Sequence, residues 1–213
     1  MEELNSEDLF QQIRAAHRMV VAYYKRLFPK IQGVADKLNL NFYYWAPTHF
    51  NRPARGSTNI LLDKSWEWDL VPGVIANYFF LSSNESNKQR SGDWMLEFHV
   101  ITDTGVSDEN RVLNQDPLEL LIPVDKAESV LCVHIWVSTK DNTLNWYNDV
   151  WASCDHSTIS DQPSVECLDE DNNIYGSCFE ISLTELVKVD VVENISRRIE
   201  KYKEYILLNH TKI

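Results

Sequence analysis

The hydrophobic pattern of the first forty residues predicts one long amphipathic helix over 7–38. Pro29 has no backbone N–H, so we expect a kink or a second helix start there. At about 1.5 Å per residue such a helix is roughly 48 Å long, and one end would project from a small domain. Steps of three and four residues place one stripe on a single helical face: Phe10, Ile13, His17, Val20, Tyr24, Leu27, Ile31, Val34 and Leu38.

After this helix the pattern changes to the two-residue period of strands. The segment 94–102 alternates most regularly, so that Glu97 and His99 share one strand face and Phe98 and Val100 share the other. A second amphipathic helix is expected to begin at 184 or 190 and to end at 208. The remaining predicted strands are 42–45, 59–63, 74–81, 129–139 and 175–183.

This order of elements predicts an α+β fold, because the strands are not separated by regular helices as they are in parallel sheets. We expect a mostly antiparallel, twisted sheet with the two terminal helices packed on one face. Long acidic loops would cover the other face or leave part of it exposed. The 213 residues fit one domain, 1–213, and their 44% hydrophobic content is sufficient for a sizeable core.

The negative charge of the chain is concentrated in residues 103–172. This segment contains fifteen Asp and Glu residues but three Lys and Arg residues, while both flanks are neutral, so it carries the whole net charge of −12. A concentrated negative field favours cationic partners and metal ions and disfavours nucleic acid. We therefore expect these carboxylates to gather on one exposed surface.

Aromatic residues within the acidic segment suggest what such a surface would do. Trp146, Tyr147 and Trp151, with Asp149 and Asp155, predict a contact site for a basic protein surface. The leading functional hypothesis is thus a binding or inhibitor-type module, comparable to immunity proteins. The alternative role of these rings is to anchor the loop onto the sheet.

A second hypothesis is a metal-dependent hydrolase. Glu97 and His99, with Asp69 or Asp93 upstream, are similar in spacing to the PD-(D/E)xK nuclease motif, in which two carboxylates hold Mg²⁺. The chain departs from that motif, because His99 replaces the lysine and no proline precedes either aspartate. A strand that happens to expose a glutamate and a histidine is the alternative interpretation.

A variant of this hypothesis places a zinc or iron site between two strands. Glu97, His99 and His134 would converge if 94–102 and 129–139 pair in a suitable register, which sequence does not reveal. Under either variant the cofactor is a divalent metal; otherwise none is expected.

Two loops offer weaker candidates. Arg52 and Arg55 in the loop 49–57 would bind an anion, or pair with nearby carboxylates as a plain surface loop. The stretch 169–180 has the oxygen spacing of an EF-hand, but Ile174 stands where the sharp turn needs glycine, so we expect an acidic hairpin turn instead.

The remaining features concern location and assembly. The N-terminus lacks a signal-peptide pattern and no apolar run approaches about 20 residues, which predicts a cytoplasmic protein without membrane contact. The cysteines are then reduced, although Cys167 and Cys178 flank a turn and their pairing is left open. The N-terminal stripe also leaves a homodimer as an alternative. No phosphate-binding loop, GxSxG or HExxH motif occurs.

Overall fold

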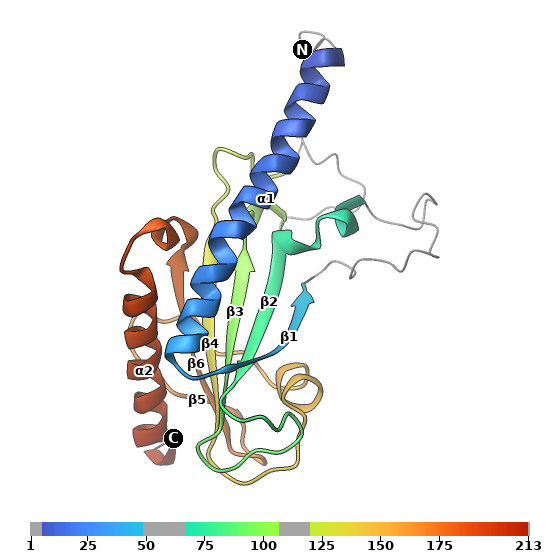
Figure 1. The fold of residues 1–213 in the computed structure, drawn as a ribbon. Coiled ribbons are helices and arrows are strands. Elements are labelled where there is room, and N and C mark those ends of the chain that lie inside the picture. Colours follow the sequence, from blue (N-terminus) through green and yellow to red (C-terminus); the bar gives the residue numbers. More distant parts are fainter. Residues whose placement is uncertain (1–5, 49–66, 107–119, 213) are drawn as a thin grey trace.

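The computed structural model describes residues 6–48, 67–106 and 120–212, and it confirms the α+β class. Two long helices pack on one face of a single antiparallel sheet of six strands (Figure 1). The predicted strand at 59–63 lies outside the described residues. The elements are α1 (Ser6–Lys37), β1 (Asn41–Pro47), β2 (Ile75–Leu81), β3 (Trp94–Ile101), β4 (Val130–Ser138), β5 (Glu166–Asp169), β6 (Ile174–Ser182) and α2 (Val191–Asn209).

The strands follow the order β1-β2-β3-β4-β6-β5 across the sheet. The first four form a meander, and the final hairpin inverts so that β6 pairs with β4 and the short β5 forms the edge. In the register of β3 and β4, Glu97 lies directly opposite His134 and His99 lies opposite Cys132. The register therefore fixes which polar side chains meet in the centre of the sheet.

Both helices cover the same face of the sheet, as the sequence predicts. Leu27, Ile31 and Val34 of α1 and Ile199 of α2 pack into one core with the inward residues of the strands, among them Phe98. The helices also contact each other, and Lys37 of α1 forms an ion pair with Glu193 of α2 at 2.5 Å. The C-terminal helix is thus held by both the sheet and the N-terminal helix.

The long helix α1 runs through Pro29 without interruption, so the expectation of a second helix start at this proline is wrong. Pro29 is exposed, and water can satisfy the carbonyl that the missing N–H leaves unpaired. Residues 7–21 are all exposed, and this end of α1 extends beyond the sheet (Figure 1). The packed part of the helix is its C-terminal half. Neither long helix within the described ranges carries an apolar stretch sufficient to span a bilayer.

The second face of the sheet is covered by the polar segment that follows β4. This cover segment, residues 139–165, contains a π-helical turn, Trp146–Trp151, named η5. Trp146 and Val150 are fully buried against strand residues on the face away from the helices, such as Phe79 and Met95. Trp146 therefore anchors the loop onto the sheet. It is not exposed, as it would have to be to contact a partner protein.

The acidic residues of 103–172 do not gather on one surface among the described residues. Asp103, Asp125 and Glu128 lie around the start of β4, whereas Asp141 and Asp149 follow its end. A nine-residue strand is about 30 Å long. These two sets of carboxylates are therefore separated by the length of β4, and Asp161 lies elsewhere, 3.8 Å from Arg198 of α2.

Shortening one buried helix side chain should show how strongly α2 supports the fold. Ile199→Ala removes a side chain that is 0% exposed between α2 and the sheet, and we expect a loss of about 2–5 kcal/mol in the free energy of unfolding, measured by urea denaturation. Glu200→Ala, at the adjacent exposed position, serves as control and should change it by less than about 0.5 kcal/mol. Equal losses in both variants would contradict this packing.

Candidate metal centre

The centre of the covered sheet face carries two polar side chains that face each other. Glu97 from β3 and His134 from β4 occupy directly opposite register positions, so their side chains project to the same face. Glu97 is 1% exposed and His134 is 8% exposed. Polar groups at this depth need partners, and the cover segment and the neighbouring strands supply some of them.

A third polar side chain, His156, reaches the same place from the cover segment. Its position depends on the local structure before it. The Asn145 side chain accepts hydrogen bonds from the backbone N–H groups of Tyr147 and Asn148 and so caps η5. Burial of Trp146 and Val150 then fixes the turn against the sheet. Five residues after the end of η5, the chain returns His156 to the sheet.

The His156 ring is held in place by edge-to-face contacts with three other rings. Ring centroid distances are 5.0 Å to Trp136, 5.6 Å to Trp151 and 5.8 Å to His134. Trp151 in turn stacks on Tyr147 with their centroids 5.0 Å apart. Aromatic contacts of this kind are each worth about 0.5–1.5 kcal/mol beyond the area they bury.

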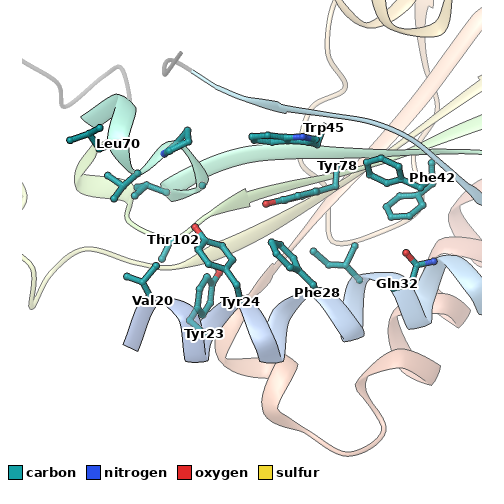
Figure 2. A pocket seen from close by; sticks show the side chains of 16 residues that line it. Val20, Tyr23, Tyr24, Phe28, Gln32, Phe42, Trp45, Leu70, Tyr78 and Thr102 are labelled. Atoms are coloured by element: carbon teal, nitrogen blue, oxygen red, sulfur yellow. Dashed lines mark hydrogen bonds between the residues drawn. The ribbon is translucent and has the colours of Figure 1, made fainter. Parts of the chain in front are cut away.

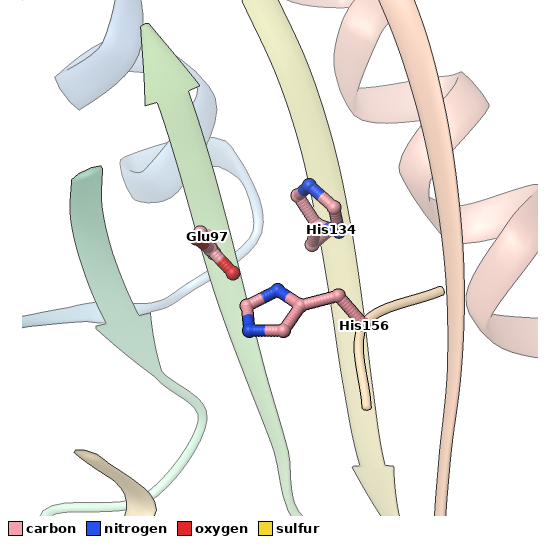
Figure 3. A group of neighbouring side chains, drawn as sticks. All are labelled: Glu97, His134 and His156. Carbon is pink, nitrogen blue, oxygen red and sulfur yellow. The ribbon is translucent and has the colours of Figure 1, made fainter. Parts of the chain in front are cut away.

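Glu97, His134 and His156 together form a potential metal-binding group (Figure 3). One ligand atom from each residue lies within 4.8 Å of the ligand atoms of the other two. His156 is exposed whereas Glu97 and His134 are buried, so solvent approaches this cluster from the side of His156.

Each of the three residues has a supporting contact and retains an atom for coordination. Trp136 Nε1 donates to Glu97 Oε2 at 3.1 Å, and Trp151 Nε1 donates to Glu97 Oε1 at 2.9 Å. Each carboxylate oxygen keeps a further lone pair. Nε2 of His134 lies 3.5 Å from the Cys178 sulfur, while its Nδ1 is buried without a hydrogen-bond partner. His156 interacts with the backbone of Trp151.

The environment favours the neutral form of all three side chains. Burial raises the pKa of the Glu97 carboxyl to about 7, and the two indole donors offset this only in part. Burial lowers the pKa of His134 to about 3, assisted by the nearby His99 and His156 rings. The His156 residue is exposed overall, but Trp136 and Trp151 cover part of its ring, and this partial desolvation also lowers its pKa. Neutral imidazoles are the form that binds metals.

The structure brings together part of the site predicted from sequence. Glu97 and His134 meet as the zinc or iron hypothesis requires, but His99 is two residues further along β3 and is not in the cluster, where His156 takes the third place. Asp69 lies in the 3₁₀ turn Glu67–Leu70, and Asp93 accepts a hydrogen bond from the Arg90 backbone in the turn before β3. Neither aspartate is a member of the group formed by Glu97, His134 and His156.

The other candidates have the following positions. Tyr147 and Trp151 are half-buried, and Asp149 and Asp155 are exposed, so contact with a basic partner through these four stays a prediction. Arg52 and Arg55 lie outside the described residues.

The EF-hand-like stretch is a hairpin between β5 and β6. Asp169 accepts hydrogen bonds from Asn172, and Asn173 has a positive φ of 53°. Cys167 and Cys178 are both free thiols.

The opposite pKa shifts of Glu97 and His134 predict opposite pH effects in metal-free protein. Because the Glu97 pKa is raised, its contribution is present at low pH and is lost as pH rises from about 4.5 to about 7. The stability difference between wild type and Glu97→Gln should therefore fall across this range, by an amount on the order of 3 kcal/mol.

The difference in unfolding free energy between wild type and His134→Asn should instead rise between about pH 3 and pH 6.5. The reason is that the folded protein disfavours protonation of this buried ring, whose pKa is lowered. Denaturation of EDTA-treated protein at several pH values measures both differences. Parallel slopes for the two variants would contradict the assigned environments.

Comparison with known proteins places the chain in a family. The family model described as PM0109 matches residues 3–206. The uncharacterised protein PM0109 of Pasteurella multocida (strain Pm70) is 24% identical to this chain over 187 residues, which cover 86% of each protein. No solved structure gives a significant match. Since the family match spans nearly the whole described fold, including every residue of the candidate metal centre, this chain belongs to the PM0109 family.

Proposed function

We propose that this chain binds a divalent transition-metal ion through Glu97, His134 and His156, and that it is a metal-dependent hydrolase. The observation that carries the metal site is the convergence of one ligand atom from each of these residues within 4.8 Å of the other two. In addition, Nδ1 of His134 is buried without a hydrogen-bond partner. An unsatisfied polar atom at this depth costs about 1–3 kcal/mol, and coordination of an ion removes that cost.

The ligand set fits zinc best. Two imidazoles and one carboxylate are typical zinc ligands, whereas magnesium and calcium prefer oxygen alone. Ligand atoms about 2.0–2.1 Å from a tetrahedral zinc lie about 3.3 Å from one another. The upper separation of 4.8 Å requires a small inward adjustment of the side chains. His156 on the cover segment is the ligand best placed to make it.

The contacts around the ligands support the same conclusion. Metal-binding histidines usually engage their second ring nitrogen, and ligating carboxylates are usually hydrogen-bonded in turn. His134 meets the first condition through Cys178, and Glu97 meets the second through Trp136 and Trp151. These contacts hold the donor atoms in place before an ion arrives.

Three protein ligands leave one position of a tetrahedral ion open, which is the feature of catalytic rather than structural zinc sites. An ion at such a position lowers the pKa of water and polarises a substrate oxygen. The exposed side of His156 gives a route for water and substrate to reach it. Hydrolysis is therefore the reaction class that this arrangement supports best.

The binding module for a basic partner is the less well supported proposal. Its premise is one coherent acidic surface, whereas described carboxylates of 103–172 lie at both ends of β4 and, in the case of Asp161, beside α2. The exposed Asp149 and Asp155 near half-buried Tyr147 and Trp151 are what still supports it.

Zinc titration of metal-free protein tests the metal site directly. Isothermal titration calorimetry should give one zinc per chain for the wild type. His156→Asn removes a ligand and should raise the dissociation constant by about 100-fold or more. Trp151→Phe keeps a ring but loses the indole N–H to Glu97, so binding should weaken by about 10- to 100-fold.

The matched control is His99→Asn, which changes a histidine on the same strand outside the cluster. Its affinity for zinc should stay within a few-fold of wild type. Absence of stoichiometric zinc in the wild type, or an unaltered affinity in folded His156→Asn, would overturn the proposed site.

Cobalt substitution tests whether a coordination position is open. Co²⁺ in the site should give visible absorption bands of a four- or five-coordinate ion, and added azide should change these bands by occupying the open position. The His156→Asn variant serves as the reference for nonspecific cobalt. A cobalt spectrum unaffected by azide would indicate a closed, structural site and would exclude the hydrolase while leaving metal binding intact.

A further inference from the structure

A large apolar cavity lies on the opposite face of the sheet from the candidate metal centre, between α1 and the end of the sheet formed by β1 and β2. Its volume is about 660 Å³, within the range of about 300–1,000 Å³ that is typical of small-molecule sites. Figure 2 shows Tyr24 and Phe28 of α1 pointing across it toward Tyr78 of β2.

Among the described residues, the walls of this cavity are aromatic and uncharged. Seven of the sixteen described lining residues carry aromatic rings, and none of these sixteen carries a charge. Tyr24 and Phe28 stack at a centroid distance of 5.1 Å, and Phe28 meets Tyr78 edge-on at 5.6 Å. Rings in these geometries present faces and edges to a further ring. A charged ligand would be left unpaired here, at a high desolvation cost.

Large apolar side chains at the mouth of the cavity remain exposed. Val20, Phe28, Phe42, Leu70 and Val71 are between 41% and 67% exposed, and all five line this one cavity. Single exposed apolar residues are common, but a contiguous group around a concave site marks a binding surface. The exposed apolar area therefore has a shape that a small molecule would fill.

A few hydroxyl groups in the cavity lining provide hydrogen-bonding positions. The Tyr23 hydroxyl lies 3.3 Å from Oγ1 of Thr102. The Tyr24 hydroxyl approaches the backbone at Gly73 so closely that a methyl group there would overlap it. Burial raises the pKa of Tyr24 to about 12 and also raises that of Tyr78, so both phenols stay neutral hydrogen-bonding groups at physiological pH.

We infer that this cavity binds an uncharged, predominantly aromatic small molecule of two or more rings, held by stacking between the α1 rings and Tyr78 and oriented by a tyrosine hydroxyl. This inference is independent of the metal centre, which lies beneath the cover segment on the other side of the sheet.

A pair of fluorescent probes tests both the site and its chemistry. N-phenyl-1-naphthylamine is uncharged, and 1-anilinonaphthalene-8-sulfonate is the same ring system with a sulfonate. The uncharged probe should bind the full chain saturably, with one site and a large gain in fluorescence. The sulfonate should bind at least about 10-fold more weakly, because none of the described lining residues carries a charge to compensate it. Absence of saturable binding by the uncharged probe, or equal affinity for both, would overturn the inference.

Two phenylalanines on α1 provide a matched pair of variants. Phe28→Ala removes a lining ring that is 44% exposed, so the fold should tolerate it, and affinity for N-phenyl-1-naphthylamine should fall about 10-fold. Phe10→Ala removes a ring that is 57% exposed on the same helix but does not line the cavity, and affinity should stay within two-fold of wild type. Equal effects of both variants would place the probe elsewhere.

An aliphatic competitor separates ligand classes. 1-Dodecanol is uncharged but lacks rings, so it should displace the probe only at concentrations well above those of 2-naphthol. Stronger displacement by 1-dodecanol than by 2-naphthol would assign the cavity to alkyl chains and would overturn the aromatic class proposed here.

Discussion

The structure depends on burial of both faces of its central strand pair. All nine residues of β4 are buried, and in β3 only His99 and Ile101 are partly exposed. An antiparallel sheet usually leaves one face to solvent, so this chain must supply a second layer opposite the helices. The cover segment 139–165 supplies that layer with Trp146 and Val150 as its anchors. Glu97 and His134 are buried because this layer exists.

Burial on both sides also explains the chemistry of the site. The Glu97 carboxyl and the His134 imidazole are buried and the His156 ring is partly covered by tryptophan rings, so the charged form of each is disfavoured. Natural cores seldom retain such groups unless they are paired or bind a metal. Trp136 and Trp151 each donate a hydrogen bond to one oxygen of the Glu97 carboxyl group, so both of its oxygens have a partner.

Periodicity predicted most of the fold, because the helices and β3 bury one regular face of an element. It identified Glu97 on β3 and His134 on β4, and register, which sequence does not encode locally, then brought them together. His156 had no comparable signal, since a residue in a covering loop follows no repeat and its position depends on how Trp146 is buried. The charge pattern of 103–172 did not reveal where its carboxylates lie, for a related reason. Acidic residues that precede β4 and those that follow it are separated in space by the length of that strand.

The three candidate ligands come from two independent layers, two from the sheet and one from the cover segment. Packing of the cover segment on the sheet would then be coupled to binding of the ion. An ion that binds only the packed arrangement stabilises it by mass action. Scarcity of the ion would loosen this face while leaving the helix-covered core intact. The two sides of the molecule would therefore differ in their tolerance of chelation, although one continuous sheet joins them.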